Sequence, residues 1–270
     1  MFDNPNFPQS FREYKNLIRA EKKWNKCFGI GSNKTATSTL NYIFQNLYGF
    51  SSNQSLLEIN ATIQVMRGNF NPLFNTITNQ DFAQDMPISG GLTYVALDAF
   101  FPNSKFILTL RDEEKWAKSF VAFYVNIISE IVKGEKFSKN NYLFKGYIHN
   151  WMNFYWKDSI KILRESLGNI EKINFEDLKK RIISNKLFKT SIIQKFNYRN
   201  NQIIDYFSLR PNDLFVVDLT KEDDITNITS FLEIPNILFS PIPRLDPKSS
   251  KKELKNDEIF LDYSKIKFDF

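Results

Sequence analysis

Hydrophobic residues are distributed along the chain in two ways, as short unbroken runs and as longer stretches with helical spacing. The short runs predict buried strands at 26–30, 105–110 and 213–218, with a weaker candidate at 81–85. The longer stretches predict helices at 11–24, 37–49, 54–67, 87–101, 113–132, 140–168, 190–207 and 223–232. An irregular segment around Pro72 and an extended, proline-rich tail from Pro235 complete the prediction.

The order of these elements predicts the fold class. Strands that alternate with helices favour parallel pairing with right-handed crossovers. We therefore predict an α/β fold, a three-layer α/β/α sandwich around a mainly parallel sheet, similar to that of P-loop NTPases. A length of 270 residues suits one domain over 1–270, with an N-terminal helix at 1–24 and an extended tail at 235–270.

Ligands in such folds bind where parallel strands end. The turns after Ile30, near Asp85 and after Leu110 are expected to lie on one edge of the sheet.

Composition narrows the class of ligand. Hydrophobic residues make up 42% of the chain, which suffices for a large core, and the net charge of +6 favours anionic ligands. No zinc-finger spacing or RNA-recognition signature is present, so nucleic acid is not an expected partner. The basic cluster at 248–252 is interpreted as a solvated tail.

Cysteine and histidine are too few for several kinds of site. The only cysteine is Cys27 and the only histidine is His149, so an intrachain disulfide and a Cys/His metal site are excluded. A Ser-His-Asp triad would depend on His149, which lies among aromatic residues and is expected to be structural. No run of 18 apolar residues and no signal-peptide pattern occurs, so we expect no membrane span and a cytoplasmic location.

The turn after the first strand has the composition of an anion-binding loop. Gly31–Thr39 leads into a helix, and a helix N-terminus offers unpaired N–H groups to a phosphate. Lys34 adds a cation, and three hydroxyl residues add donors, namely Thr35, Thr37 and Ser38. Asn33 stands where a Walker A motif needs its second glycine, so this loop is not that motif. The alternative is an ordinary capped helix start.

A second candidate anion site follows the strongest strand. Arg111 ends that strand, and Ser119 lies eight residues later, two turns into the next helix. An arginine fork and a hydroxyl can together bind one phosphate. The alternative is that Arg111 pairs with Asp112 or Glu114 at the helix start.

Together these segments resemble the PAPS-dependent sulfotransferases of the bacterial type (PAPS is 3′-phosphoadenosine 5′-phosphosulfate). Gly31–Leu40 resembles the 5′-phosphosulfate loop of that family, and Arg111–Ser119 resembles its 3′-phosphate element. The resemblance continues in order to Leu245 through Asp85–Pro87, Asn200–Leu219, Phe231–Pro235 and Ile242–Leu245.

The resemblance implies an activity and a site. A sulfuryl group would move from PAPS to a hydroxyl or amine, leaving 3′,5′-ADP, without a metal. The implied donor site consists of Ser32, Asn33, Lys34, Thr35, Ala36, Thr37, Ser38, Arg111 and Ser119. Lys34 would stabilise charge on the leaving oxygen. Trp116 would pack near the adenine, and its alternative, the more frequent one for a tryptophan on a helix face, is a place in the core.

Asp85 is the implied general base, and its alternative is an N-cap for a helix that begins at Pro87. The acceptor, a small molecule, a glycan or a lipid, is expected under the aromatic region 124–156.

Some positions depart from the family pattern. Ala36 replaces the loop glycine, and Arg199 stands where the subgroup often has histidine. The Arg-Lys-Gly triplet of the animal cytosolic enzymes is absent, with Arg199, Arg244 and Lys248 as candidate replacements.

Two rival functions remain open from the sequence. One is a P-loop kinase or NTPase that holds Mg²⁺ through Asp112 or Asp218, and the other is a non-catalytic binding protein with a sulfotransferase fold.

Overall fold

The computed structural model describes residues 21–52, 57–134, 147–222 and 225–234. The predicted extended tail, with Arg244 and Lys248, lies outside the described residues. Most of the predicted N-terminal helix also lies outside them, and its last four residues, 21–24, are not helical.

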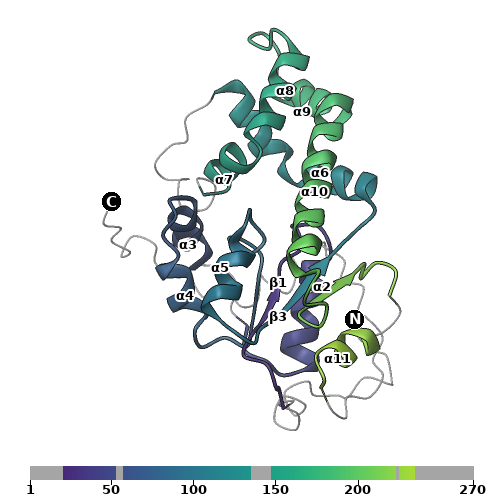
Figure 1. Ribbon diagram of the computed structural model, residues 1–270. Coiled ribbons are helices and arrows are strands. Elements are labelled where there is room, and N and C mark those ends of the chain that lie inside the picture. Colours follow the sequence, from purple (N-terminus) through teal and green to yellow (C-terminus); the bar gives the residue numbers. More distant parts are fainter. Residues whose placement is uncertain (1–20, 53–56, 135–146, 223–224, 235–270) are drawn as a thin grey trace.

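Four short strands form a wholly parallel sheet at the centre of the molecule (Figure 1). They are β1 (Cys27–Gly29), β2 (Phe82–Gln84), β3 (Lys105–Thr109) and β4 (Leu214–Val217). All four lie within predicted strands, and their order is β2-β1-β3-β4. In this register Gly29 pairs with Gln84 on one side and with Ile107 on the other. The turns after β1, β2 and β3 therefore share one edge, as predicted.

Helices cover both faces of the sheet, which confirms the three-layer α/β/α architecture. Alternate strand residues face opposite layers. Cys27 and Ile107 pack into a core with α2 (Thr37–Tyr42), which continues as a π-helical turn (Ile43–Leu47), and with α11 (Thr226–Phe231). Phe28 and Phe106 face the other layer, formed by α3 (Leu57–Met66), α4 (Asn71–Ile77), α5 (Thr93–Phe100) and the end of α10 (Lys186–Phe207).

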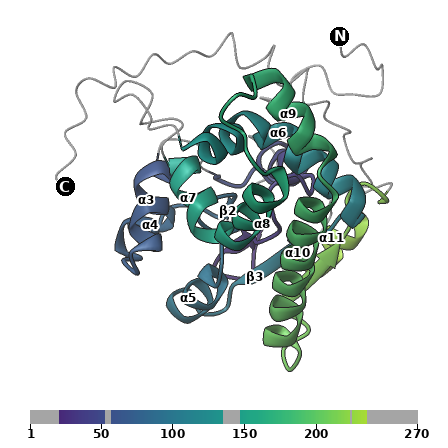
Figure 2. The ribbon, with the colours of Figure 1, turned by 90° about the horizontal axis from the view of Figure 1, so that it is seen from above.

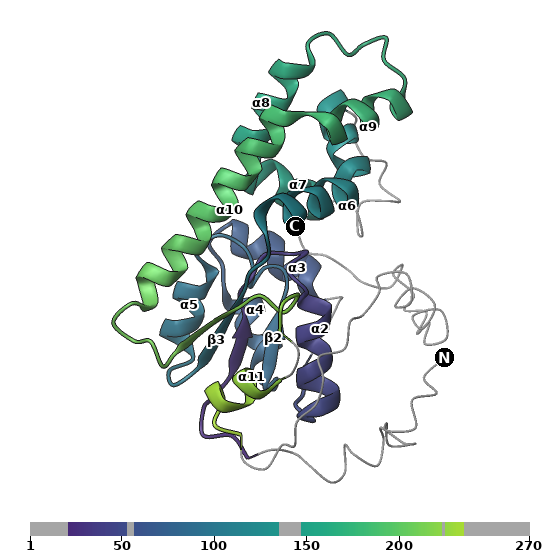
Figure 3. The ribbon, with the colours of Figure 1, turned by 90° about the vertical axis from the view of Figure 1, so that its right-hand side faces the viewer.

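A third core lies beyond the carboxyl edge of the sheet. It contains α6 (Glu113–Lys133), α7 (Tyr147–Tyr155), α8 (Lys157–Leu167), α9 (Phe175–Ser184) and the first half of α10. Seen from above, α7, α8 and α10 lie over the strands (Figure 2). Figure 3 shows α10 running from this helical part down one side of the sheet. Helix α10 thereby connects the sheet to the helical part that covers the carboxyl edge of the sheet.

Two predicted helices differ from the observed ones because of local geometry. The helix predicted from Pro87 begins at Thr93, since a turn containing Gly90 and Gly91 precedes it. Gly91 has φ 46°, and a Cβ there would lie 2.6 Å from the Tyr155 ring. The single helical region predicted at 140–168 is divided at Trp156 into α7 and α8.

Two helices were not predicted. In α4, Pro72 occupies the first helical turn, where its missing N–H leaves no hydrogen bond unmade, so the supposedly irregular segment is helical. In α9, the Asn174 side chain caps the helix by accepting a hydrogen bond from the Asp177 N–H at 2.9 Å. Among the described helices, none has the length and apolar character needed to cross a membrane.

Candidate functional site

The loop after β1 is shaped by contacts from α6 and the end of β3. Lys34 and Ala36 adopt left-handed backbone conformations, with φ 74° and 66°. The indole N–H of Trp116 donates to the Asn33 carbonyl at 3.0 Å, and Arg111 Nη1 donates to the Lys34 carbonyl at 3.0 Å. The loop then enters α2, whose first N–H groups have no partner within the helix. This geometry suits an anion, as the sequence predicted.

The base of the loop is fixed against β3. A Cβ on Gly31 would lie 2.0 Å from Thr109 Oγ1, so this position accepts only glycine. Thr35 is fully buried and donates to the Ser32 carbonyl at 2.5 Å, and its hydroxyl lies 2.6 Å from that of Thr109. The Thr35 hydroxyl therefore joins the two ends of the turn and links it to β3. The sequence had predicted that this hydroxyl contacts the ligand.

Lys34 and Asp85 form the charged centre of the site. Asp85 follows β2, and its Oδ1 is buried without a hydrogen-bond partner among the residues described. Burial raises the pKa of Asp85 to about 6, although the Thr37 hydroxyl and the Lys34 charge act to lower it. Burial and the nearby Arg111 lower the pKa of Lys34, whereas Asp85 acts to raise it. Each group thus acts on the pKa of the other, and both follow neighbouring strands, β1 and β2, at the same edge of the sheet, although they form no salt bridge with each other.

Backbone strain is concentrated at this centre. Five non-glycine residues in the described part of the chain have left-handed backbone, and three of them are Lys34, Ala36 and Asp85. This conformation costs roughly 1–2 kcal/mol per residue and tends to accumulate at functional sites. Because no helix begins at Pro87, the alternative N-cap role of Asp85 is wrong.

The Lys34 ammonium rests on an aromatic ring that the sequence did not identify. Its Nζ lies 4.2 Å from the centroid of the Phe123 ring on α6, and Phe123 is 58% exposed. A cation over an aromatic face is attracted by the ring quadrupole. Phe123 thus holds the lysine at the mouth of the loop.

Arg111 lies at the end of β3, as predicted, and it does not take the alternative role of pairing with Asp112 or Glu114. It forms no salt bridge within the described residues, and its Nε is buried without a partner. Asp112 instead caps α6 by accepting from the Lys115 N–H at 2.9 Å. Ser119 lies two turns further along α6 and is half-buried. Because its Nε has no hydrogen-bond partner, Arg111 has a donor available for an anion.

Of the two roles considered for Trp116, the structure confirms a place in the core and leaves no exposed ring face for an adenine. Trp116 is fully buried and stacks on Phe196 of α10, with ring centroids 4.1 Å apart. Its role is to hold the loop through the hydrogen bond to Asn33.

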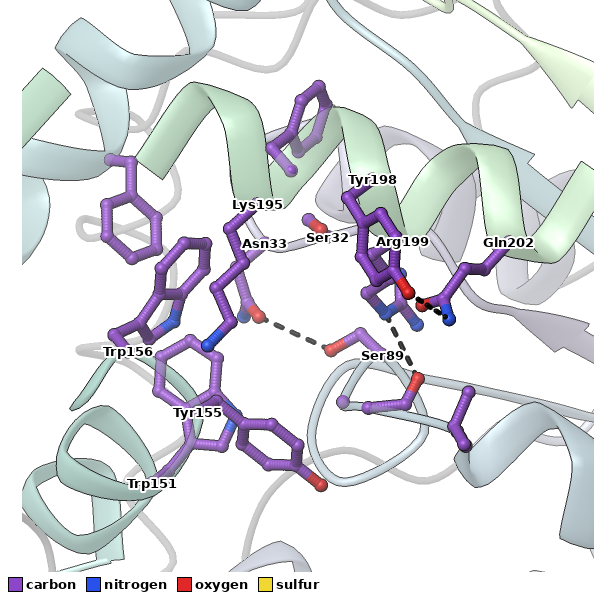
Figure 4. Close-up of a pocket in the computed structure, with 15 residues that line it drawn as sticks. Ser32, Asn33, Ser89, Trp151, Tyr155, Trp156, Lys195, Tyr198, Arg199 and Gln202 are labelled. Carbon is purple, nitrogen blue, oxygen red and sulfur yellow. Dashed lines mark hydrogen bonds between the residues drawn. The ribbon is translucent and has the colours of Figure 1, made fainter. Parts of the chain in front are cut away.

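A cavity of about 160 Å³ adjoins the loop (Figure 4). Ser32 and Asn33 of the loop line one part of it, and the turn 89–92 lines another. Its aromatic walls include Trp151, Tyr155 and Trp156, which belong to the region where the acceptor was expected. Lys195 and Arg199 of α10 also line it. The spacing of four residues between these two cations, which places them on one helix face, is the sequence signal that could have identified them.

The other candidate residues are less informative. His149 lies in α7, but its side chain falls outside the described residues. Ala36 and Thr37 are half-buried beside the loop, and Ser38 is exposed.

Comparison with known proteins identifies the family. The sequence model of a family described as a sulfotransferase domain matches residues 26–236, from just before β1 to the segment after α11. No curated protein matches the chain at a significant level. The matched region contains the loop, Asp85, Arg111 and the cavity-lining residues of α10.

Proposed function

Because the chain belongs to the sulfotransferase domain family, we propose that it moves a sulfuryl group from PAPS to a hydroxyl or amine of a small acceptor. The observation that carries the proposal is that Lys34, on a left-handed loop at a helix N-terminus, and Asp85, with its buried and unpartnered Oδ1, follow neighbouring strands at one edge of the sheet. The proposal includes a cytoplasmic location and a metal-free mechanism, both expected from the sequence alone.

The order of the strands supports the arrangement of the two substrates. β1 lies between β2 and β3, so Asp85 and Arg111 flank the loop on opposite sides. The loop amides and the N-terminus of α2 would hold the 5′-phosphosulfate. Arg111 and Ser119 would hold the 3′-phosphate on the β3 side, which leaves the β2 side for the acceptor. The buried, unpartnered Nε of Arg111 fits this role.

Lys34 would supply the main stabilisation of the transition state. PAPS provides the sulfuryl group, and negative charge develops on the oxygen that leaves with the nucleotide. A cation aimed at that oxygen binds the transition state more tightly than the ground state. Lys34 reaches it by leaving the ring of Phe123, from which only a weak contact is lost.

Asp85 would accept the proton of the acceptor. A carboxyl group with a pKa of about 6 is mainly ionised at neutral pH, yet it is a stronger base than an ordinary aspartate. Its unpartnered Oδ1 has a free acceptor position for that proton. A well-placed base contributes roughly 10²–10⁴-fold to rate.

The test is the turnover of a Lys34→Met variant. We expect the rate of 3′,5′-ADP formation from PAPS, across a panel of phenols and amines, to fall by about 10²–10³-fold. The melting temperature of the variant is measured alongside, because Lys34 also contacts Phe123 and offsets the charge of Asp85. Lys118→Met, which alters an exposed lysine on α6, is the matched control and should retain full activity. Undiminished turnover in Lys34→Met would refute the assigned role.

A further inference from the structure

The cavity beside the loop contains an arginine with only neutral partners. Arg199 Nη1 donates to the Ile30 carbonyl at 2.9 Å, and its Nε donates to the Gly91 carbonyl at 3.3 Å. Nη2 is buried and has no partner in the described part of the chain, where the guanidinium also forms no salt bridge. Burial lowers the pKa of Arg199 to about 10, although Tyr94 and Tyr155 act to raise it. A buried charge without an anion is costly, and an anionic ligand would remove that cost.

Lys195 places a second cation in the same cavity. It lies four residues before Arg199 on α10, and side chains with that spacing are neighbours on a helix face. Its Nζ lies 5.8 Å from the centroid of the Trp156 ring, and Figure 4 shows the side chain projecting from α10 towards Trp156 and the aromatic residues of α7. Burial lowers the pKa of Lys195, and Asp158 acts in the opposite direction.

The available donors favour a carboxylate ligand. Arg199 Nη2 is buried without a partner in the described ranges, and Lys195 lines the same cavity. A carboxylate has two oxygens that accept charge-assisted hydrogen bonds, so it can accept one from each of these side chains.

The rest of the lining is mainly apolar and aromatic. Phe120, Trp151, Tyr155, Trp156 and Phe196 form its walls, and Leu92 lies at the turn after β2. Flat aromatic rings pack favourably against such walls. Ser32 and Asn33 border the cavity directly before Lys34, and the Ser89 N–H donates to the Asp85 carbonyl at 2.8 Å. The cavity therefore borders the loop that contains Lys34 and the turn that begins at Asp85, although neither of these residues lines it.

We propose that the acceptor is an aromatic hydroxy acid whose carboxylate binds Lys195 and Arg199 while its hydroxyl faces Lys34 and Asp85. This inference rests on the proposed function, because it identifies the substrate class of the same site. It makes Lys195 and Arg199 determinants of specificity, since they would bind the acceptor equally in the ground state and in the transition state.

The test measures binding in the absence of the donor. The probes are 3-(4-hydroxyphenyl)propanoate and its uncharged amide, 3-(4-hydroxyphenyl)propanamide. Their affinities are measured by calorimetry at pH 7.5. We expect the wild-type protein to bind the acid at least about tenfold more tightly, which is the usual effect of a charge-assisted hydrogen bond. Lys195→Gln should remove most of that preference and leave the affinity for the amide unchanged.

Two further variants control for folding and for net charge. Lys186→Gln makes the same change at an exposed position at the start of α10 and should retain the preference for the acid. Arg199→Lys keeps the positive charge but loses part of the contact with the Ile30 and Gly91 carbonyls. If it melts like the wild type, it should retain part of the preference for the acid.

The outcomes separate this inference from the proposed function. Equal affinity for acid and amide, or a preference that survives Lys195→Gln, would overturn the inference. Loss of 3′,5′-ADP binding in Lys195→Gln would also overturn it, because the cation would then belong to the donor site. If neutral phenols are sulfated and the acid is not, the proposed function holds and the inference fails. If the acid binds selectively but is never sulfated, the proposed function fails and an anion site remains.

Discussion

At the scale of single residues, Ala36 occupies a conformation better suited to glycine. Its φ of 66° brings its Cβ close to the following carbonyl group, and this steric contact costs free energy. Glycine has no Cβ and avoids that cost. Ala36→Gly should therefore raise the free energy of unfolding by about 1 kcal/mol, as measured by urea denaturation. It should also tighten the binding of 3′,5′-ADP, because the backbone can approach the phosphate more closely. A loss of stability in Ala36→Gly would show that the loop does not have this conformation.

Asp85 should control the dependence of both activity and stability on pH. With a pKa of about 6, activity should rise with pH around a midpoint near 6. The folded-state pKa exceeds the unfolded value of roughly 3.9, so the folded protein binds more protons between these values. Its stability therefore decreases as pH rises from about 4 to 6.

Asp85→Asn should remove both effects. The variant should lose roughly 10²–10⁴-fold in rate and be more stable than the wild type above pH 6, with the difference vanishing below about pH 4. Asp98→Asn is the control of opposite sign. Burial acts to raise the pKa of Asp98, yet hydrogen bonds from Arg210 and Tyr206 bring it below its ordinary value. That variant should be less stable than the wild type at neutral pH. Denaturant titrations at pH 4 and pH 7 distinguish the two cases.

At the scale of elements, α6 positions the anion-binding loop through one hydrogen bond. Trp116→Phe keeps a buried aromatic ring but removes the donor to the Asn33 carbonyl. We expect it to lower the free energy of unfolding by about 1–2 kcal/mol and to weaken 3′,5′-ADP binding.

Trp24→Phe provides a matched control for that variant. Its indole N–H donates to the Leu232 carbonyl at 3.0 Å, away from the loop, so the stability cost should be similar and nucleotide binding unaffected. Similar nucleotide affinity in both variants would show that α6 does not position the loop.

The elements also show what the sequence can and cannot predict. Three of the four strands were predicted because each is a compact apolar run, whereas β2 was only a weaker candidate. The sites at Lys34 and Arg111 were predicted because each follows such a run. The start of α5 was not predicted. The turn that precedes it packs so closely against Tyr155, which is distant in the sequence, that Gly91 has no room for a side chain. Likewise, the roles of Trp116 and Thr35 depend on partners from other elements, which spacing along the chain does not reveal.

At the scale of the whole molecule, the helical part and the sheet together form the site. The sheet provides Lys34, Asp85 and Arg111 on one edge, and α10 brings Lys195 and Arg199 to the same edge from the helical core. Aromatic residues of α7, together with Trp156 directly after it, complete the cavity. Donor and acceptor are therefore expected to bind on opposite sides of one central loop.

The measurement that tests this account most directly is the thermal shift caused by 3′,5′-ADP without Mg²⁺, compared with AMP, which lacks the 3′-phosphate. At 100 times its Kd the nucleotide should raise the melting temperature by roughly 5–10 °C. AMP should have a smaller effect, and Arg111→Ala, referred to its own ligand-free melting temperature, should lose the difference between the two nucleotides. Equal stabilisation of the wild type and Arg111→Ala by 3′,5′-ADP, or stabilisation only by ATP with Mg²⁺, would show that Lys34 and Arg111 do not bind opposite phosphates of one nucleotide.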